Sequence, residues 1–226
     1  MKGVILKSLV AVAVIAVSLA GFGQLASAAE GAKPLQIALF NPIQLVPEEE
    51  GIKGFGFNFI YGKNAGVTGM DLGLVNVVSG DVLGANFGFV GYTEGNVQGM
   101  QEGLVSVVQG NVMGGSAGFV AYTEGNVQGS QVGLVSVVQG DVMGGSFGFV
   151  NYINGNSAGA QFGGINIATE AKGVQLGAVN YSTKFEGFAF GLVNWTEQLN
   201  GIQIGLVNVA TAKDMLPVLP IVNAAW

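Results

Sequence analysis

The carboxylates are the side chains of this sequence that could do chemistry at neutral pH. Glu94 and Glu124 occupy the same position of a repeat 30 residues apart, and paired carboxylates are what glycoside hydrolysis uses. Asp81 and Asp141 each follow a glycine, but the Gly-Gly-x-Gly-x-Asp nonapeptide of calcium-binding β-rolls is missing. Because these acids are scattered near expected turns, we interpret them as solvated side chains rather than as a catalytic or metal site.

Other reactive groups are few. The 226 residues contain no His and no Cys, which removes the usual general base, the thiolate nucleophile and the common nitrogen and sulfur metal ligands. Ser106 and Ser136 lie in expected strands with no His to act as a base. We therefore expect a non-catalytic protein with no cofactor and no metal.

The N-terminus reads as an export signal. Lys2 and Lys7 precede an apolar run, and Ala26-Ser27-Ala28 forms a cleavage site of small residues. The run is too short for a convincing spanning helix, and an uncleaved N-terminal anchor is the alternative. We expect an exported protein of the periplasm, outer membrane or cell surface.

The charge of the exported chain excludes some partners. Without residues 1–28 the chain keeps six lysines, no arginine and 14 acidic residues, a net charge of −8. It has no basic patch for phosphate groups, so we expect no nucleic-acid partner and no charge-driven binding to anionic lipids.

A repeat dominates the remainder of the chain. The string GLVSVVQG occurs at 103–110 and again at 133–140, and each 30-residue unit divides into halves that begin with Gly-x-x-x-Gly. The spacing is 15 residues and then 14, which gives ten units from 69 to about 214, with first glycines at Gly69, Gly84, Gly99, Gly114, Gly129, Gly144, Gly159, Gly173, Gly187 and Gly201. Alternating β-branched and aromatic residues with this glycine density predict strands and exclude helix.

The fold class we predict is all-β, a repeat β-solenoid of about ten coils of 14–15 residues, in which equivalent residues stack about 4.8 Å apart. Stacked amides would then form an asparagine ladder at Asn166, Asn180, Asn194 and Asn208 and a glutamine ladder at Gln161, Gln175 and Gln203. The alternative is a ten-stranded transmembrane β-barrel, whose strands a 15-residue unit could also supply.

Both faces of the expected strands are apolar. If columns of Leu and Phe, such as Leu74 and Phe89, fill the coil, a column of Val and aromatic residues is left outside. Otherwise the chain bends near the asparagine position and encloses both columns. An exposed apolar column indicates contact with a second copy or a membrane, and the candidate contact residues are Tyr92, Tyr122, Tyr152, Tyr181 and Trp195.

Four segments are expected along the chain. They are the signal at 1–28, an N-terminal cap at 29–68 with strands near 36–40 and 54–61, the β-repeat domain at 69–214, and a C-terminal cap at 215–226. Caps are needed because open strand edges invite aggregation, and the prolines of MLPVLPIVNAAW would stop strand addition.

Three stretches carry a resemblance to a family. They are IQLVPEEEGIKGFGFNFIYGKNAGVTGMDLGLVNVVSGDVLG, repeat units such as GVQLGAVNYS and GIQIGLVNVA, and the ending LPVLPIVNAAW. Together, over about residues 36–226, they resemble the leptospiral-type surface-repeat family of bacterial proteins. Two units depart from its pattern, with Ser116 and Ser146 in place of Gln. The resemblance implies an exported repeat protein, and no binding residue is carried over from the family.

The sequence thus predicts a structural or interaction protein that presents a repetitive β surface to an envelope component or a partner protein. Self-association and contact with a membrane are both open at this point. The alternative function, a small outer-membrane β-barrel, depends on the alternative fold.

Overall fold

The computed structural model describes residues 32–213 and 216–226, and its regular structure is all β. The signal expected at 1–28 lies outside the described residues, as do residues 29–31 of the expected N-terminal cap. The strands are β1 (Lys33–Phe40), β2 (Ile43–Gln44), β3 (Ile52–Asn64), β4 (Val67–Val78), β5 (Val82–Thr93), β6 (Val97–Val108), β7 (Val112–Thr123), β8 (Val127–Val138), β9 (Val142–Leu176), β10 (Val179–Phe190), β11 (Val193–Ala210) and β12 (Val218–Ala225).

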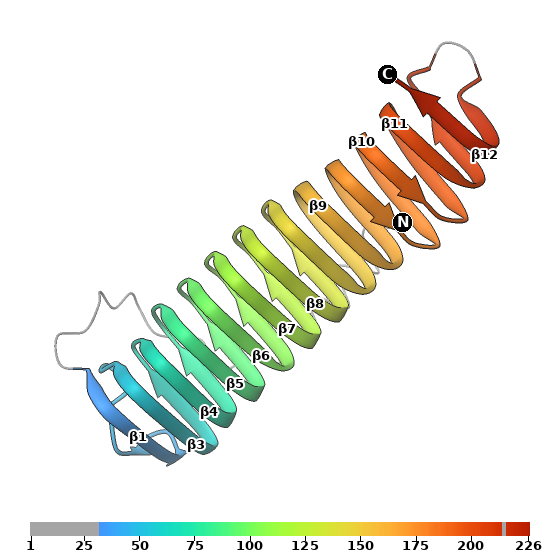
Figure 1. Ribbon diagram of the computed structural model, residues 1–226. Coiled ribbons are helices and arrows are strands. Elements are labelled where there is room, and N and C mark those ends of the chain that lie inside the picture. The colour runs from blue at the N-terminus through green and yellow to red at the C-terminus, as the bar shows by residue number, and fades with distance from the viewer. Residues whose placement is uncertain (1–31, 214–215) are drawn as a thin grey trace.

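The strands form one parallel stack. Consecutive strands from β3 to β11 pair with one another in parallel, and the sheet order runs from β12 through β11 down to β3, β1 and β2. Successive coils lie along a straight axis (Figure 1). The prediction of a repeat β-solenoid is confirmed. The barrel alternative is wrong, because up-and-down barrels need antiparallel neighbours and a closed order, whereas this sheet ends at β12 and β2.

Eleven glycines with positive φ set the repeat, from Gly54 at the first coil to Gly201 at the last. At Gly114 φ is 126°, and an added Cβ would lie 2.2 Å from the carbonyl oxygen of Gly99 in the preceding coil. A side chain is therefore excluded at this position on grounds of both conformation and space. The repeat begins one coil earlier than the sequence pattern indicates, since β3 pairs in register with β4 from Ile52.

Each coil is a flattened loop with an inside and an outside. In the coils that begin at Gly69 to Gly144, counted from the first glycine, the side chains at Gly+2, Gly+7, Gly+9 and Gly+13 point inward. Those at Gly+1, Gly+3, Gly+5, Gly+6 and Gly+8 alternate with them, although the valines at Gly+8 are buried. The turn at Gly+11 and Gly+12 of these coils carries Gly-Asn or Gly-Asp. There the backbone N–H of Asn96 donates to Oδ1 of Asp81 in the coil before, and Asn111 repeats this bond to Asn96.

One half of the interior is aliphatic. Valines at Gly+13, for example Val82, Val97 and Val112, are buried and pack near the buried Gly+9 residues such as Val78 and Val108. Full burial of one such side chain stabilises the fold by about 1.5–3 kcal/mol. This column is the conventional hydrophobic core of the rod.

The other half of the interior is a polar ladder. The predicted asparagine ladder is present: Nδ2 of Asn166 donates to Oδ1 of Asn180 at 2.8 Å, Asn180 donates to Asn194 at 2.7 Å, and Asn194 donates to Asn208 at 2.8 Å. Each of these three Nδ2 groups also donates to a backbone carbonyl of the next coil. These amides are fully buried, so the bonds compensate for the loss of water.

The glutamine ladder is shorter than the sequence suggests. Gln175 donates to Gln161 at 2.6 Å. Gln203 lies two coils further on, because Ala189 occupies the same column between them. In the coils with Ser106 and Ser136, hydrogen bonds between side-chain hydroxyls take the place of the asparagine ladder. Ser106 pairs with Ser116, and Ser136 pairs with Ser146, across the interior.

The expectation that Leu and Phe columns fill the coil is wrong, and so is the alternative that both apolar columns are enclosed. Leu74 and Phe89 are exposed. The interior beside the asparagines has no room for them, because an added Cβ on Gly191 would lie 2.8 Å from Nδ2 of Asn180. The large side chains are therefore left outside.

Antiparallel strands close both ends of the stack. At the N-terminal end, β2 pairs antiparallel with β1, and the expected strands near 36–40 and 54–61 are present as β1 and β3. At the C-terminal end, β12 pairs antiparallel with β11, and Nζ of Lys213 donates to Oδ1 of Asn223 at 2.8 Å. Neither end offers another coil the parallel register of the repeat.

One carboxyl lies inside the rod. Asp71 occupies a Gly+2 position with no solvent exposure, where later coils carry Asn86 and Gln101. Its Oδ1 accepts a hydrogen bond from Nδ2 of Asn58 at 2.9 Å, and its Oδ2 has no partner. Burial raises the pKa of this carboxyl to about 7, although the bond from Asn58 opposes the shift.

Adjacent glycines provide a test of the stacking constraint. Gly114→Ala is expected to lower the free energy of unfolding by at least about 2 kcal/mol, because it forces a side chain into a conformation and a space that exclude it. Gly115→Ala is the control, since nothing lies within 3.8 Å of its added Cβ, and it should change stability by less than about 1 kcal/mol. Urea denaturation measures both, and equal effects would contradict the constraint.

Asp71 predicts a pH dependence of stability. Its pKa rises from the ordinary 3.8 to about 7 on folding, so the folded state binds more protons between these values. The free energy of unfolding should be highest below about pH 4 and fall by up to about 4 kcal/mol as the pH rises past 7. Denaturation curves at several pH values should show that Asp71→Asn removes this fall. Asp81→Asn in the exposed turn should retain it, and an unchanged fall in Asp71→Asn would contradict the assignment.

Candidate interaction surface

The exterior of the rod carries a continuous apolar surface. It consists of the Gly+1, Gly+3 and Gly+5 columns of successive coils, here called the Leu/Phe/Met face. Its exposed members include Met70, Leu74, Phe89, Met100, Leu104, Phe119, Val132, Leu134, Phe147, Phe149, Phe162, Phe188, Phe190, Leu192 and Leu206. Period-2 alternation produces this arrangement, because Gly+2 and Gly+4 between them point inward.

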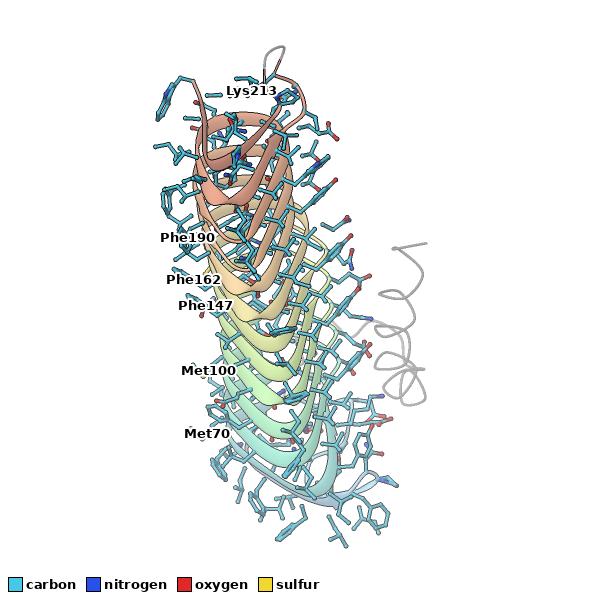
Figure 2. All side chains as sticks on the ribbon, turned by 90° about the vertical axis from the view of Figure 1, so that its right-hand side faces the viewer. Met70, Met100, Phe147, Phe162, Phe190 and Lys213 are labelled. Atoms are coloured by element: carbon cyan, nitrogen blue, oxygen red, sulfur yellow. The ribbon has the colours of Figure 1, made fainter. Side chains whose placement is uncertain are left out.

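Figure 2 shows the asymmetry of the rod. Met70, Met100, Phe147, Phe162 and Phe190 project from one side, and side-chain oxygen and nitrogen atoms gather on the opposite side over most of the length. The rings of Phe147 and Phe162 stack at 5.4 Å with an interplanar angle of 1°. Equivalent side chains therefore form ordered ridges along the rod.

The contact residues predicted from the sequence lie on the other broad face, at Gly+8. Tyr181 stacks on Trp195 at 4.7 Å and 3°. Between tyrosines of neighbouring coils lie smaller residues, and Val107 is buried there. Tyr92, Tyr122 and Tyr152 are half-buried. Contact of these residues with a partner stays a prediction.

The acids that the sequence pairs are separated in space. Glu94 and Glu124 lie two coils apart, about 10 Å along the axis, with Gln109 in the coil between them. Burial raises the pKa of Glu94, and Lys63 partly opposes this shift. The pKa of Tyr92 is raised by burial and then by Glu94 and Glu124. These two acids do not form a carboxylate pair.

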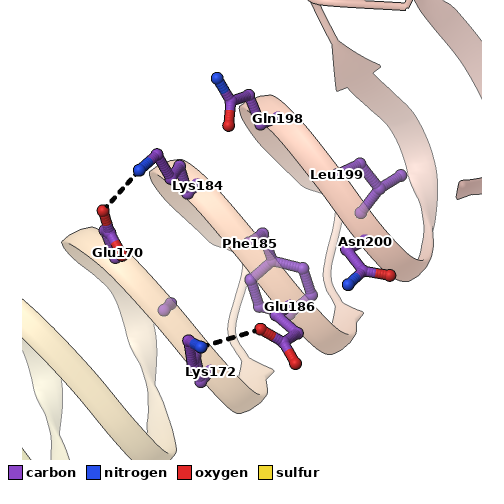
Figure 3. Close-up of a pocket in the computed structure, with 9 residues that line it drawn as sticks. Glu170, Lys172, Lys184, Phe185, Glu186, Gln198, Leu199 and Asn200 are labelled. Atoms are coloured by element: carbon purple, nitrogen blue, oxygen red, sulfur yellow. Dashed lines mark hydrogen bonds and ion pairs between the residues drawn. The ribbon is translucent and has the colours of Figure 1, made fainter. Parts of the chain in front are cut away.

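A hollow of about 380 Å³ opens where the repeat shortens to 14 residues. Glu170 and Lys184 form an ion pair of 2.8 Å at its rim, and Lys172 and Glu186 form another of 3.0 Å (Figure 3). Phe185, among the lining residues, is almost fully buried. Since each charge has a partner of opposite sign, and exposed pairs contribute little energy, the hollow offers no free charge to a ligand.

Across residues 32–213 and 216–226, no group of three or more His, Cys, Asp or Glu side chains is placed to hold a metal ion. The same residues include no helix with the length and apolar character to cross a membrane.

Comparison with known proteins gives no match, whether with family models, curated proteins or solved structures. The resemblance to a surface-repeat family therefore stays a prediction.

Sequence reasoning missed the burial of Asp71 and the exposure of the Leu/Phe/Met face. Alignment of the repeats places Asp71 in one column with Asn86 and Gln101, which is the signal for its inward position. The exposed phenylalanines were assigned to the interior. The usable signal was the asparagine at Gly+7, which needs a partner inside the coil.

The exposed phenylalanines are expected to matter for surface properties more than for folding. Phe89, Phe119 and Phe149 are 57%, 61% and 62% exposed. Replacing all three with Ser should at least halve the fluorescence of a dye that binds apolar surface, while costing less than about 1 kcal/mol of stability per substitution. The control replaces exposed polar residues elsewhere, Gln109, Glu124 and Glu197, with Ser. A comparable fluorescence loss in the control would contradict the assignment.

Proposed function

We propose that this chain is an exported, non-catalytic rod of the cell envelope that binds an envelope component or a partner protein through the Leu/Phe/Met face. The observation that carries the proposal is the row of ordered, exposed Phe, Leu and Met side chains along the whole rod. Contiguous exposed apolar surface of this extent marks an interaction site in folded proteins.

The rigidity of the rod supports a role in binding. Hydrogen bonds of the sheet connect every coil to the next, and the asparagine ladder adds bonds between the coils from Asn166 to Asn208. Because the face is fixed before it meets a partner, little conformational entropy is lost on association. Phenylalanine and methionine are also enriched at protein interfaces.

The chemistry of the chain supports a role without catalysis. It has no His or Cys, and the acids Glu94 and Glu124 stand apart. The charged groups around the 380 Å³ hollow are paired with one another. A function in the periplasm, outer membrane or cell surface rests on the signal-like residues 1–28.

Export and retention can be tested together in the source organism. The full chain should lose residues 1–28, as read by intact mass, and should fractionate with the envelope. Replacing Phe89, Phe119 and Phe149 with Ser should release most of the protein into the soluble fraction, because the partner surface is removed. The control with Gln109, Glu124 and Glu197 replaced by Ser should remain bound. An uncleaved cytoplasmic chain, or equal retention of both variants, would overturn the proposal.

A further inference from the structure

The Leu/Phe/Met face has a fixed spacing that limits what can cover it well. Its ridges repeat once per coil, about 4.8 Å apart, along a straight axis (Figure 1). A surface that fits these ridges over their whole length must have the same repeat. A second copy of this chain is a partner that has it, and like surfaces meet in two-fold assemblies.

In three coils the sizes of the side chains are self-complementary. The coils of Gly84, Gly114 and Gly144 have Phe at Gly+5 and Ala or Gly at Gly+1, as in the pairs Phe89 with Ala85 and Phe119 with Gly115. A two-fold axis parallel to the rod would set Gly+5 of one copy opposite Gly+1 of the other. The Phe at Gly+5 of these three coils would then face a small residue.

The coil itself does not require a glycine at Gly115. The atoms nearest to a Cβ added there are Oγ of Ser130 at 3.8 Å and Cε of Met100 at 3.9 Å, so the isolated rod has room for an alanine. At Gly145, in contrast, the ring of Phe147 already covers the position at 2.4 Å from the added Cβ. Gly115 is thus less covered by its own rod than Gly145 is.

The size of the face is sufficient for a dimer. Three columns span four residues, or about 13 Å of strand, and eleven coils extend over about 50 Å. The face therefore covers roughly 700 Å² per copy, close to the about 800 Å² per partner of a standard stable interface.

Charge argues against an anionic membrane as the occupant. Within these columns Glu102 is the only ionisable residue from the coil of Gly69 to the coil of Gly201, and there is no Lys. The face therefore has no cation for anionic lipid headgroups. The remaining acids lie on other surfaces and repel other modes of association.

Resting on the proposed function, we infer that the Leu/Phe/Met face is covered by a second copy of this chain, with the two rods side by side and like coils facing one another. The exported protein should sediment at twice the monomer mass. Replacing Phe89, Phe119 and Phe149 with Ser should weaken dimerisation at least about 100-fold, and replacing Gln109, Glu124 and Glu197 with Ser should not. Circular dichroism checks that each variant is folded.

Cross-linking gives a second readout, because the chain has no Cys of its own. Val132 lies in the sixth of eleven coils, at the middle of the rod, where it faces the same residue of the second copy. Val132→Cys should therefore cross-link to Val132→Cys of the second copy through a bismaleimide that spans the about 10 Å between packed sheets. Phe162→Cys should cross-link as well when the rods run in the same direction. Gln109→Cys, outside the face, is the control.

Each outcome decides a point. If the protein is a monomer and its Val132→Cys variant does not cross-link, the inference that a second copy covers the Leu/Phe/Met face is overturned. If its envelope retention still depends on Phe89, Phe119 and Phe149, the proposed function survives that failure, whereas equal retention overturns both. A monomer that binds phosphatidylcholine vesicles identifies lipid as the occupant and overturns the inference. Cross-linking at Val132 without cross-linking at Phe162 overturns the parallel direction of the rods.

Discussion

The close contact between the backbones of successive coils is the constraint on which the rest of the structure depends. At each first glycine, the space for a Cβ is occupied by the carbonyl oxygen of the glycine one coil below, as Gly129 shows above Gly114. This contact fixes the register of every strand, so chemically equivalent side chains must stack. Once stacking is imposed, amides bond to amides and rings lie on rings.

Stacking also explains why the interior is partly polar and the exterior partly apolar. Inside the coil, the space between the Gly+4 glycine and the Gly+7 asparagine is only wide enough for the asparagine side chain to lie against the glycine. An asparagine column fills this space and satisfies its own hydrogen bonds along the axis, which a Leu or Phe could not do without moving the backbone. The large apolar side chains therefore occupy the outward positions of the same strands. The apolar surface follows from the way the rod is built.

Much of this could be predicted from the sequence, and the part that could not has physical reasons. The period, the strands and the ladder from Asn166 to Asn208 follow from identical residues at a fixed spacing. The inward face could not be assigned, because both sets of alternating residues are apolar and hydrophobicity alone does not distinguish them. The first coil was hidden by an extra residue between Asn58 and Tyr61, which interrupts the glycine pattern. The burial of Asp71 was hidden because its column varies among Asp, Asn, Gln, Ser and Ala.

The ends of the rod determine what kind of association the sides can support. A stack of parallel strands with free ends would add further strands along its axis, as amyloid does. Here β2 and β12 pair antiparallel at the two ends, and Pro217 and Pro220 lie in the C-terminal segment, so axial growth is blocked. Acidic residues outside the apolar columns oppose contact through the other surfaces. Association is therefore directed to the Leu/Phe/Met face, which has a finite length. Once a single partner covers this face, the face has no apolar surface left to bind a second partner.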